Sequence, residues 1–247
     1  MMTQSPAPSI VLLPGNMCDE RLWLGDGGAI VDQLRARWHL DVCDADLSRD
    51  DSIAAMAART LEAIPGPIIA IGFSMGAIVA VEMWVQAPER IVGLVLLGYN
   101  ATADLPERSA HRPRQQAEAR SGGLARLLAE ELKPNYLASA NRSDAVLLDL
   151  LLDMGMRLGP EVFVRQSEAL RTRDDRRAAL PRIFVPVLLG SGAEDALCPP
   201  EWHADWAALI PDATLFTVPD AGHMLPLEAP HALARHLNAW LLAKELT

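Results

Sequence analysis

The sequence predicts an α/β protein with a mainly parallel sheet of about six strands, flanked by helices and interrupted by a helical insertion. Two observations support this fold class. Short runs rich in valine, isoleucine and leucine recur along the chain, and such runs are typical of strands buried on both faces. Helical patterns separate them, and strands that alternate with helices form right-handed βαβ units, which produce a parallel sheet.

Six apolar runs, each followed by turn residues, are the expected strands. They span 9–15, 38–45, 66–72, 91–98, 183–190 and 214–220. Helices are expected between and after them, over 20–37, 51–63, 75–87, 200–209 and 230–245. Only about eight residues precede the first run, so we expect a fully parallel sheet without extra antiparallel strands at its start.

One interval, residues 101–180, breaks this rhythm because it contains no convincing strand. Its patterns predict three or more amphipathic helices, and its twelve arginines are matched by twelve acidic residues. We expect residues 1–100 and 181–247 to form the core domain, with 101–180 inserted as a helical cap over the carboxyl edge of the sheet. Helices that merely add packing to the core are the alternative.

Composition limits the class of protein. A chain of 247 residues that is half hydrophobic can form one large domain with a sizeable core. The net charge of −10 argues against nucleic acid or an anionic membrane surface as the main partner. No segment approaches the roughly 20 apolar residues needed to span a bilayer, and the first residues lack the basic region of a signal peptide.

The three cysteines favour a reducing compartment. Cys18, Cys43 and Cys198 are odd in number, and no two have the CxxC spacing of a zinc or redox site. We therefore expect neither disulfides nor a metal site, and a cytoplasmic location. The sequence does not determine the oligomeric state.

The stretch GFSMG places a serine between two glycines at the junction of an expected strand and an expected helix. Gly72 and Gly76 lack Cβ atoms where strand and helix approach most closely, which permits a sharp turn with Ser74 at its tip. The start of the following helix offers free N–H groups to a developing negative charge. The motif occurs by chance elsewhere, but this strand–turn–helix context predicts that Ser74 is a nucleophile.

A serine nucleophile needs a base, and one of the six histidines is suitably placed. His223 follows the last expected strand on a glycine-containing loop. His39 begins a strand, and the others fall in the expected cap or in helical stretches, where surface or packing roles are favoured. We therefore predict that His223 is the base.

A carboxylate should orient that base, and the loop after the fifth expected strand supplies candidates. Asp195 lies there, at the same sheet edge as Ser74 and His223. Its neighbour Glu194 is the main rival and Asp220 a weaker one, and a helix cap or a solvated loop residue is the alternative interpretation of Asp195.

With these motifs in this order, the chain resembles the α/β-hydrolase superfamily over almost its whole length. Four segments show the resemblance: LLPGNMCDERLW at the first strand, GFSMG, GAEDALCPP and AGHMLPLEAP. The chain order serine, aspartate, histidine is the one that this family's topology requires. The resemblance implies an α/β-hydrolase fold and also a cap inserted where 101–180 falls.

The resemblance also implies an oxyanion hole formed by the backbone N–H groups of Asn16 and Met75. Many members carry His-Gly where this chain has Pro14-Gly15, which is a departure in the oxyanion loop, and the HGGG tract of some lipases is absent. The reaction that such a site performs requires no metal, flavin or nucleotide, so no cofactor is expected.

The function that follows is a serine hydrolase, and the leading hypothesis is a carboxylesterase that acts on small or medium esters through an acyl-enzyme on Ser74. The same triad can serve carbon–carbon bond hydrolases, perhydrolases, aminopeptidases and lyases, because fold alone does not settle the reaction. A non-catalytic ligand receptor is a third possibility, although receptors on this fold usually lack a triad member, and all three are present here.

The expected partner is a small-molecule substrate. Residues beside the catalytic loops predict a mostly apolar pocket, in which we place Met17, Tyr99, Asn100 and Leu197. The balanced charge of residues 101–180 gives no reason to expect a charged substrate. The insertion is expected to select substrates by size, without activation at a lipid interface.

Overall fold

The computed structural model describes residues 7–24, 28–38, 40–132 and 135–246. Six strands form one sheet in the order β2-β1-β3-β4-β5-β6, and every pair of neighbours is parallel. The strands are β1 Ser9–Leu13, β2 Val42–Asp44, β3 Ile68–Phe73, β4 Ile91–Leu97, β5 Val187–Gly192 and β6 Ala213–Val218. The expected six-stranded parallel sheet is therefore confirmed.

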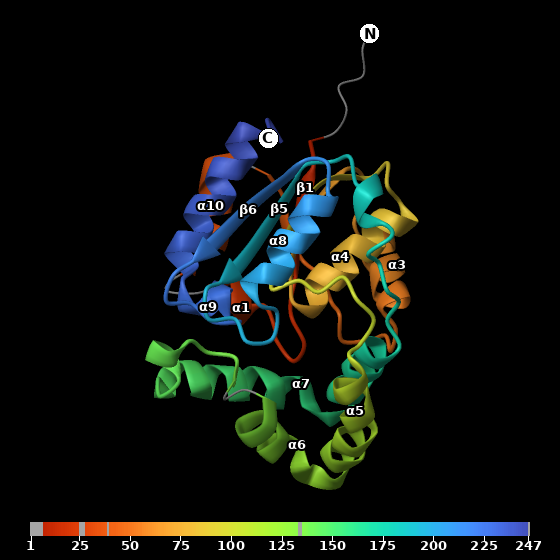
Figure 1. Ribbon diagram of the computed structural model, residues 1–247, viewed down its shortest axis with the longest axis vertical. Coiled ribbons are helices and arrows are strands. Elements are labelled where there is room, and N and C mark those ends of the chain that lie inside the picture. Colours follow the sequence, from red (N-terminus) through yellow and green to blue (C-terminus); the bar gives the residue numbers. More distant parts are fainter. Residues whose placement is uncertain (1–6, 25–27, 39, 133–134, 247) are drawn as a thin grey trace.

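Helices cover both faces of this sheet (Figure 1). The core helices are α1 Arg21–Leu24, α2 Val31–Trp38, α3 Ile53–Ala63, α4 Met75–Gln86, α8 Pro200–Leu209, α9 Leu225–Glu228 and α10 Pro230–Ala243. Residues of α3, α4 and α8 belong to one buried cluster with the sheet, whereas residues of α1, α2, α9 and α10 belong to a second. The two clusters are the two layers of core on opposite faces of the sheet.

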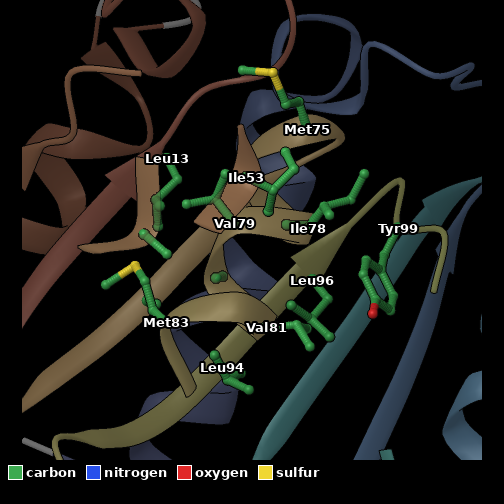
Figure 2. Packing of buried hydrophobic residues seen from close by; sticks show 14 of the residues in the cluster. Leu13, Ile53, Met75, Ile78, Val79, Val81, Met83, Leu94, Leu96 and Tyr99 are labelled. Atoms are coloured by element: carbon green, nitrogen blue, oxygen red, sulfur yellow. The ribbon is translucent and has the colours of Figure 1, made fainter. Parts of the chain in front are cut away.

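The apolar runs explain why these strands occupy the centre. All six residues of β3 are buried, as are all six of β5, because helices cover both of their faces. Figure 2 shows one of these packed faces, where Val81 of α4 lies beside Leu96 of β4 and Val79 of α4 lies beside Ile53 of α3. Each element boundary differs from its expected range by a few residues at most, except that the expected helix 20–37 is two shorter helices.

The segment 101–180, which we call the cap segment, forms helices across the edge of the sheet toward which the strands point (Figure 1). Its elements are α5 Pro106–Glu118, η2 Ala119–Gly123, α6 Leu124–Arg126, η3 Leu127–Leu132, η5 Ser139–Asn141 and α7 Ala145–Arg171, followed by η6 Leu180–Arg182. A third cluster of apolar residues joins η2, α6, η3 and α7 to Met17 of the loop after β1, so the segment packs on that loop as well as on itself.

Helix α7 is bent within its length. Gly159 has a φ of 81° and a ψ of 175°, and Pro160 follows it. Proline cannot donate to the preceding turn and its ring clashes with that turn, so the helical path is interrupted there. The half after the bend carries Arg165 and Gln166, which reach the core loop after β2: Arg165 donates to Ser48 O and Gln166 to Leu47 O.

Candidate active site

The turn between β3 and α4 holds Ser74 in a backbone conformation that is rare outside glycine. Ser74 has a φ of 52° and a ψ of −113°. Its flanking glycines allow this: a Cβ on Gly72 would lie 2.4 Å from Gly76 O, and a Cβ on Gly76 would lie 2.0 Å from Leu13 O. The crowding shows that β1, β3 and the start of α4 converge behind the serine, which leaves its hydroxyl at the sheet edge.

His223 lies on the loop between β6 and α9 and contacts the serine directly. Its Nε2 is 3.0 Å from Ser74 Oγ. The ring packs between Phe73, at 5.0 Å between centroids, and Tyr136, at 5.6 Å. The backbone N–H of His223 donates to Tyr136 O over 2.7 Å, so the cap segment fixes this loop. Gly98 leaves room for the ring, because a Cβ there would lie 2.9 Å from its Cε1.

Asp195 follows β5 and completes the hydrogen-bonded chain. Its Oδ2 is 2.8 Å from Nδ1 of His223, while its Oδ1 accepts from the backbone N–H groups of Leu197 and Cys198 at 2.9 and 2.8 Å. Burial by itself would raise the pKa of Asp195, but His223 and the two N–H donors outweigh it and hold the pKa below its ordinary value. These contacts favour the ionised form of Asp195 and place its carboxylate against Nδ1 of the imidazole.

Neither of the two rival carboxylates is hydrogen-bonded to His223 in the described structure. Glu194 accepts from Ser139, through the backbone N–H at 2.8 Å and the hydroxyl at 3.1 Å, and thereby ties the loop to the cap segment. Asp220 is exposed, with a positive φ of 56°. Of the three candidates, the structure brings only Asp195 to the imidazole of His223 within the described residues.

The loop expected to supply an oxyanion donor packs directly on the serine turn. A Cβ on Gly76 would lie 2.7 Å from Pro14 O, and a Cβ on Gly15 would lie 2.8 Å from the Phe73 ring. Asn16 lines the same cavity as Ser74, and Met75 begins α4. Across the described residues, no acceptor is recorded for the backbone N–H of Asn16 or of Met75.

Gln166 of the cap segment, which sequence reasoning missed, supports this loop. Its side chain is only 1% exposed, and its Oε1 accepts from the Met17 N–H at 2.8 Å and from Asn16 Nδ2 at 3.1 Å. Met17 has a φ of 54°, and the glutamine holds its N–H in that conformation. The available signal was its position: helical spacing places Gln166 on the same face of α7 as the apolar residues Val162, Phe163, Ala169 and Leu170.

A cavity of about 450 Å³ opens above Ser74 and His223. Asn100 and Leu197 line it, as expected. The expectation is wrong for Met17 and Tyr99, which do not line it. Met17 is fully buried among apolar residues of the cap segment, and Tyr99 packs in the core with α4 and α8.

The lining is also more polar than the expected apolar pocket. Besides apolar side chains it includes four arginines and one glutamate, namely Arg108, Arg112, Arg142, Arg173 and Glu131. The near-neutral balance of the cap segment hid this, because a sequence does not show which charges face inward. In the described parts of the chain, no group of three or more His, Cys, Asp or Glu side chains could hold a metal ion, and no helix is long and apolar enough to cross a membrane.

Comparison with known proteins agrees with this geometry. The sequence model of the alpha/beta hydrolase family matches residues 10–236. The chain belongs to this family. It is 29% identical to the pimeloyl-[acyl-carrier protein] methyl ester esterase of Nitrosomonas europaea, over 96% of this chain and 97% of that protein.

Solved structures agree with the family membership. A thermophilic esterase from Thermogutta terrifontis superposes with a TM-score of 0.82 at 25% identity, covering 98% of this chain and 91% of the other. The enol-lactonase from Burkholderia xenovorans shares the fold with a TM-score of 0.79 at 22% identity, over 96% and 92% of the two chains. Family and relatives together identify this protein as a hydrolase.

Proposed function

We propose that this hydrolase is a serine carboxylesterase that cleaves small or medium esters through an acyl-enzyme on Ser74. The observation that carries the proposal is the continuous hydrogen-bonded chain from Ser74 Oγ to His223 and from His223 to Asp195, at 3.0 and 2.8 Å. These are the distances over which a base can take a proton from a serine and a carboxylate can orient that base. The relative from Nitrosomonas europaea, named as a methyl ester esterase, supports the choice of ester chemistry.

In the proposed mechanism, His223 removes the hydroxyl proton as Ser74 Oγ attacks the ester carbonyl. The backbone N–H groups of Asn16 and Met75 stabilise the tetrahedral oxyanion, and the alcohol leaves with the proton from His223. Water, deprotonated by His223, then attacks the acyl-enzyme and releases the acid. Asp195 stays ionised throughout and stabilises the imidazolium, and the lowered pKa of its carboxyl supports this role.

The cap segment would exclude water from this site and limit substrate size. It lies across the sheet edge that carries the three residues, and its Tyr136 fixes the His223 loop. We propose a small-molecule substrate and a cytoplasmic location. Within the described residues Cys18, Cys43 and Cys198 are not joined by disulfides, which is compatible with a reducing compartment.

Covalent labelling tests the proposal. A fluorophosphonate probe should label the wild type once, Ser74→Ala should abolish the label, and His223→Gln should slow labelling by several orders of magnitude. Ser121→Ala, at an exposed serine of the cap segment, is the matched control and should be labelled normally. Labelling that persists in a folded Ser74→Ala protein would overturn the assignment, as would the absence of hydrolysis across a panel of esters, lactones and amides.

A further inference from the structure

Arg108, in the first turn of α5, lines the catalytic cavity and forms no ion pair with any carboxylate of the described residues. Its Nη2 donates to the carbonyl oxygen of Leu197 at 3.2 Å, and the N–H of Leu197 donates to Asp195. Arg108 is therefore bonded to a residue whose own N–H is bonded to the proposed triad carboxylate, Asp195. A guanidinium has five N–H donors, and among the described residues this is the single acceptor recorded for Arg108.

Two other arginines of the cavity differ from Arg108, because they form ion pairs with an acidic side chain. Arg112 and Arg173 both pair with the buried Asp104, at 2.6 and 2.9 Å. The cavity's Glu131 is likewise taken, by Arg114 at 2.6 Å. The donors of Arg108 thus remain available to a ligand.

A second unsatisfied donor belongs to the same cavity lining. Asn100 is 5% exposed, and its Oδ1 accepts from the backbone N–H and the hydroxyl of Thr102 at 3.0 and 2.9 Å. A backbone N–H can only donate, so these contacts fix the amide orientation and leave Nδ2 as the free end. Nδ2 is buried with no partner within the described structure, and a buried donor without an acceptor is costly.

The charge of the cavity is opposite to that of the chain. The protein carries a net charge of −10, yet four arginines line the cavity against one glutamate. Arg112 and Arg173 share the single carboxylate of Asp104, and the glutamate is itself paired with Arg114, so the lining stays cationic. A concave site with low-dielectric walls and one sign of charge concentrates ligands of the opposite sign. Exposed Arg142 extends the cationic lining without an ion-pair partner in the described residues.

From these observations we propose that the substrate carries a carboxylate in addition to its ester, and that Arg108 and Asn100 bind that carboxylate while the ester carbonyl meets Ser74. The substrate class is half-esters of dicarboxylic acids, or lactones bearing a carboxylate. The guanidinium fork matches two carboxylate oxygens, and the Asn100 amide supplies a further donor. Hydrolysis of the half-ester consumes one water and yields the dicarboxylate and the alcohol. The inference deepens the proposed esterase function and rests on it.

The kinetic test compares two esters with the same leaving alcohol. We would measure kcat/KM for the monoethyl and diethyl esters of succinate, glutarate and adipate. For each chain length, the preference is the kcat/KM of the monoethyl ester divided by that of the diethyl ester. Charge-assisted hydrogen bonds of this kind predict a wild-type preference for the half-ester of roughly 10- to 100-fold at one of these lengths. Arg108→Gln should reduce that ratio to near one, and added salt should lower it in the wild type.

The matched control is Arg120→Gln, in η2 directly after α5. Arg120 is exposed and pairs with exposed Glu161 on the surface of the cap segment, and neither residue lines the cavity, so its loss should leave the ratio unchanged. A wild-type ratio at or below one at every length would overturn the proposal. So would an equal fall of the ratio in both variants, because that would indicate a general field rather than a carboxylate site.

A binding test separates this inference from the proposed chemistry. Ser74→Ala protein is titrated calorimetrically with each dicarboxylate and with the diethyl ester, and then again with Arg108→Gln or Asn100→Ala added. The site is supported if a dicarboxylate binds more tightly than the diethyl ester and if either added substitution weakens that binding at least tenfold. This holds even if no ester is hydrolysed. Equal or absent dicarboxylate binding refutes the carboxylate site even if fluorophosphonate labels Ser74.

Discussion

Replacing Gln166 by leucine should reduce catalysis although the residue lies outside the proposed triad. The substitution keeps a buried side chain of similar length but removes the acceptor of the Met17 N–H and of Asn16 Nδ2, and the donor to Leu47 O. The Met17 N–H is buried, so the loop must relax or leave that donor unsatisfied. Relaxation would rotate the peptide beside Asn16, whose N–H is the proposed oxyanion donor.

The contacts set the size of the effect. A buried donor left unsatisfied costs about 1–3 kcal/mol, and each lost hydrogen bond contributes about 1 kcal/mol. A combined 2–3 kcal/mol would reduce the population of the competent loop roughly 30- to 140-fold. Complete loss of one oxyanion donor typically lowers kcat by about 100- to 1000-fold, which is the upper limit. We therefore expect kcat to fall about 30- to 100-fold, with KM changed much less.

The assay measures kcat and KM on an activated ester, together with the affinity of a trifluoromethyl ketone whose adduct on Ser74 is a tetrahedral oxyanion. Both kcat and inhibitor affinity should fall by similar factors. Arg165→Met is the matched control, because Arg165 lies beside Gln166 on α7 and donates to Ser48 O at 2.9 Å without touching the oxyanion loop. A folded Gln166→Leu protein with kcat within about threefold of wild type would refute the reasoning, as would an equal loss in Arg165→Met.

Two further predictions concern carboxylates. Asp195→Asn should lower kcat by about four orders of magnitude because it favours the wrong tautomer of His223. Glu194→Gln, measured on the same ester, should keep kcat within a few-fold of wild type. The reverse ranking would assign the triad carboxylate to Glu194. Glu131 tests pH dependence: the hydrogen bond from Arg114 lowers its pKa from 4.5 to about 2, so its stabilisation is complete above pH 4.5 and is lost as pH falls toward 2. Glu131→Gln should flatten the decline in unfolding free energy over that interval, measured by urea titration, and an unchanged slope would contradict the pairing.

The sequence by itself determined the strands, the helices and the serine turn. These features depend on local patterns: runs of branched apolar residues form strands buried on both faces, and Gly72-Phe73-Ser74-Met75-Gly76 removes side chains where strand and helix cross. It also ordered the candidate nucleophile, acid and base along a parallel sheet, whose strand ends all lie at one edge. That is why Asp195 and His223 could be predicted although 28 residues separate them.

Only the tertiary structure decided what faces the cavity. Asp195 and Glu194 are adjacent in sequence, and the turn after β5 directs one to His223 and the other to Ser139. Gln166 meets the oxyanion loop 149 residues away because α7 bends at Gly159 and Pro160. The charge count of the cap segment is near neutral. In the folded protein most of its carboxylates pair with other arginines, whereas Arg108 lies beside the active site without such a pair in the described structure. Contacts of this kind depend on how distant segments pack, and no local periodicity encodes them.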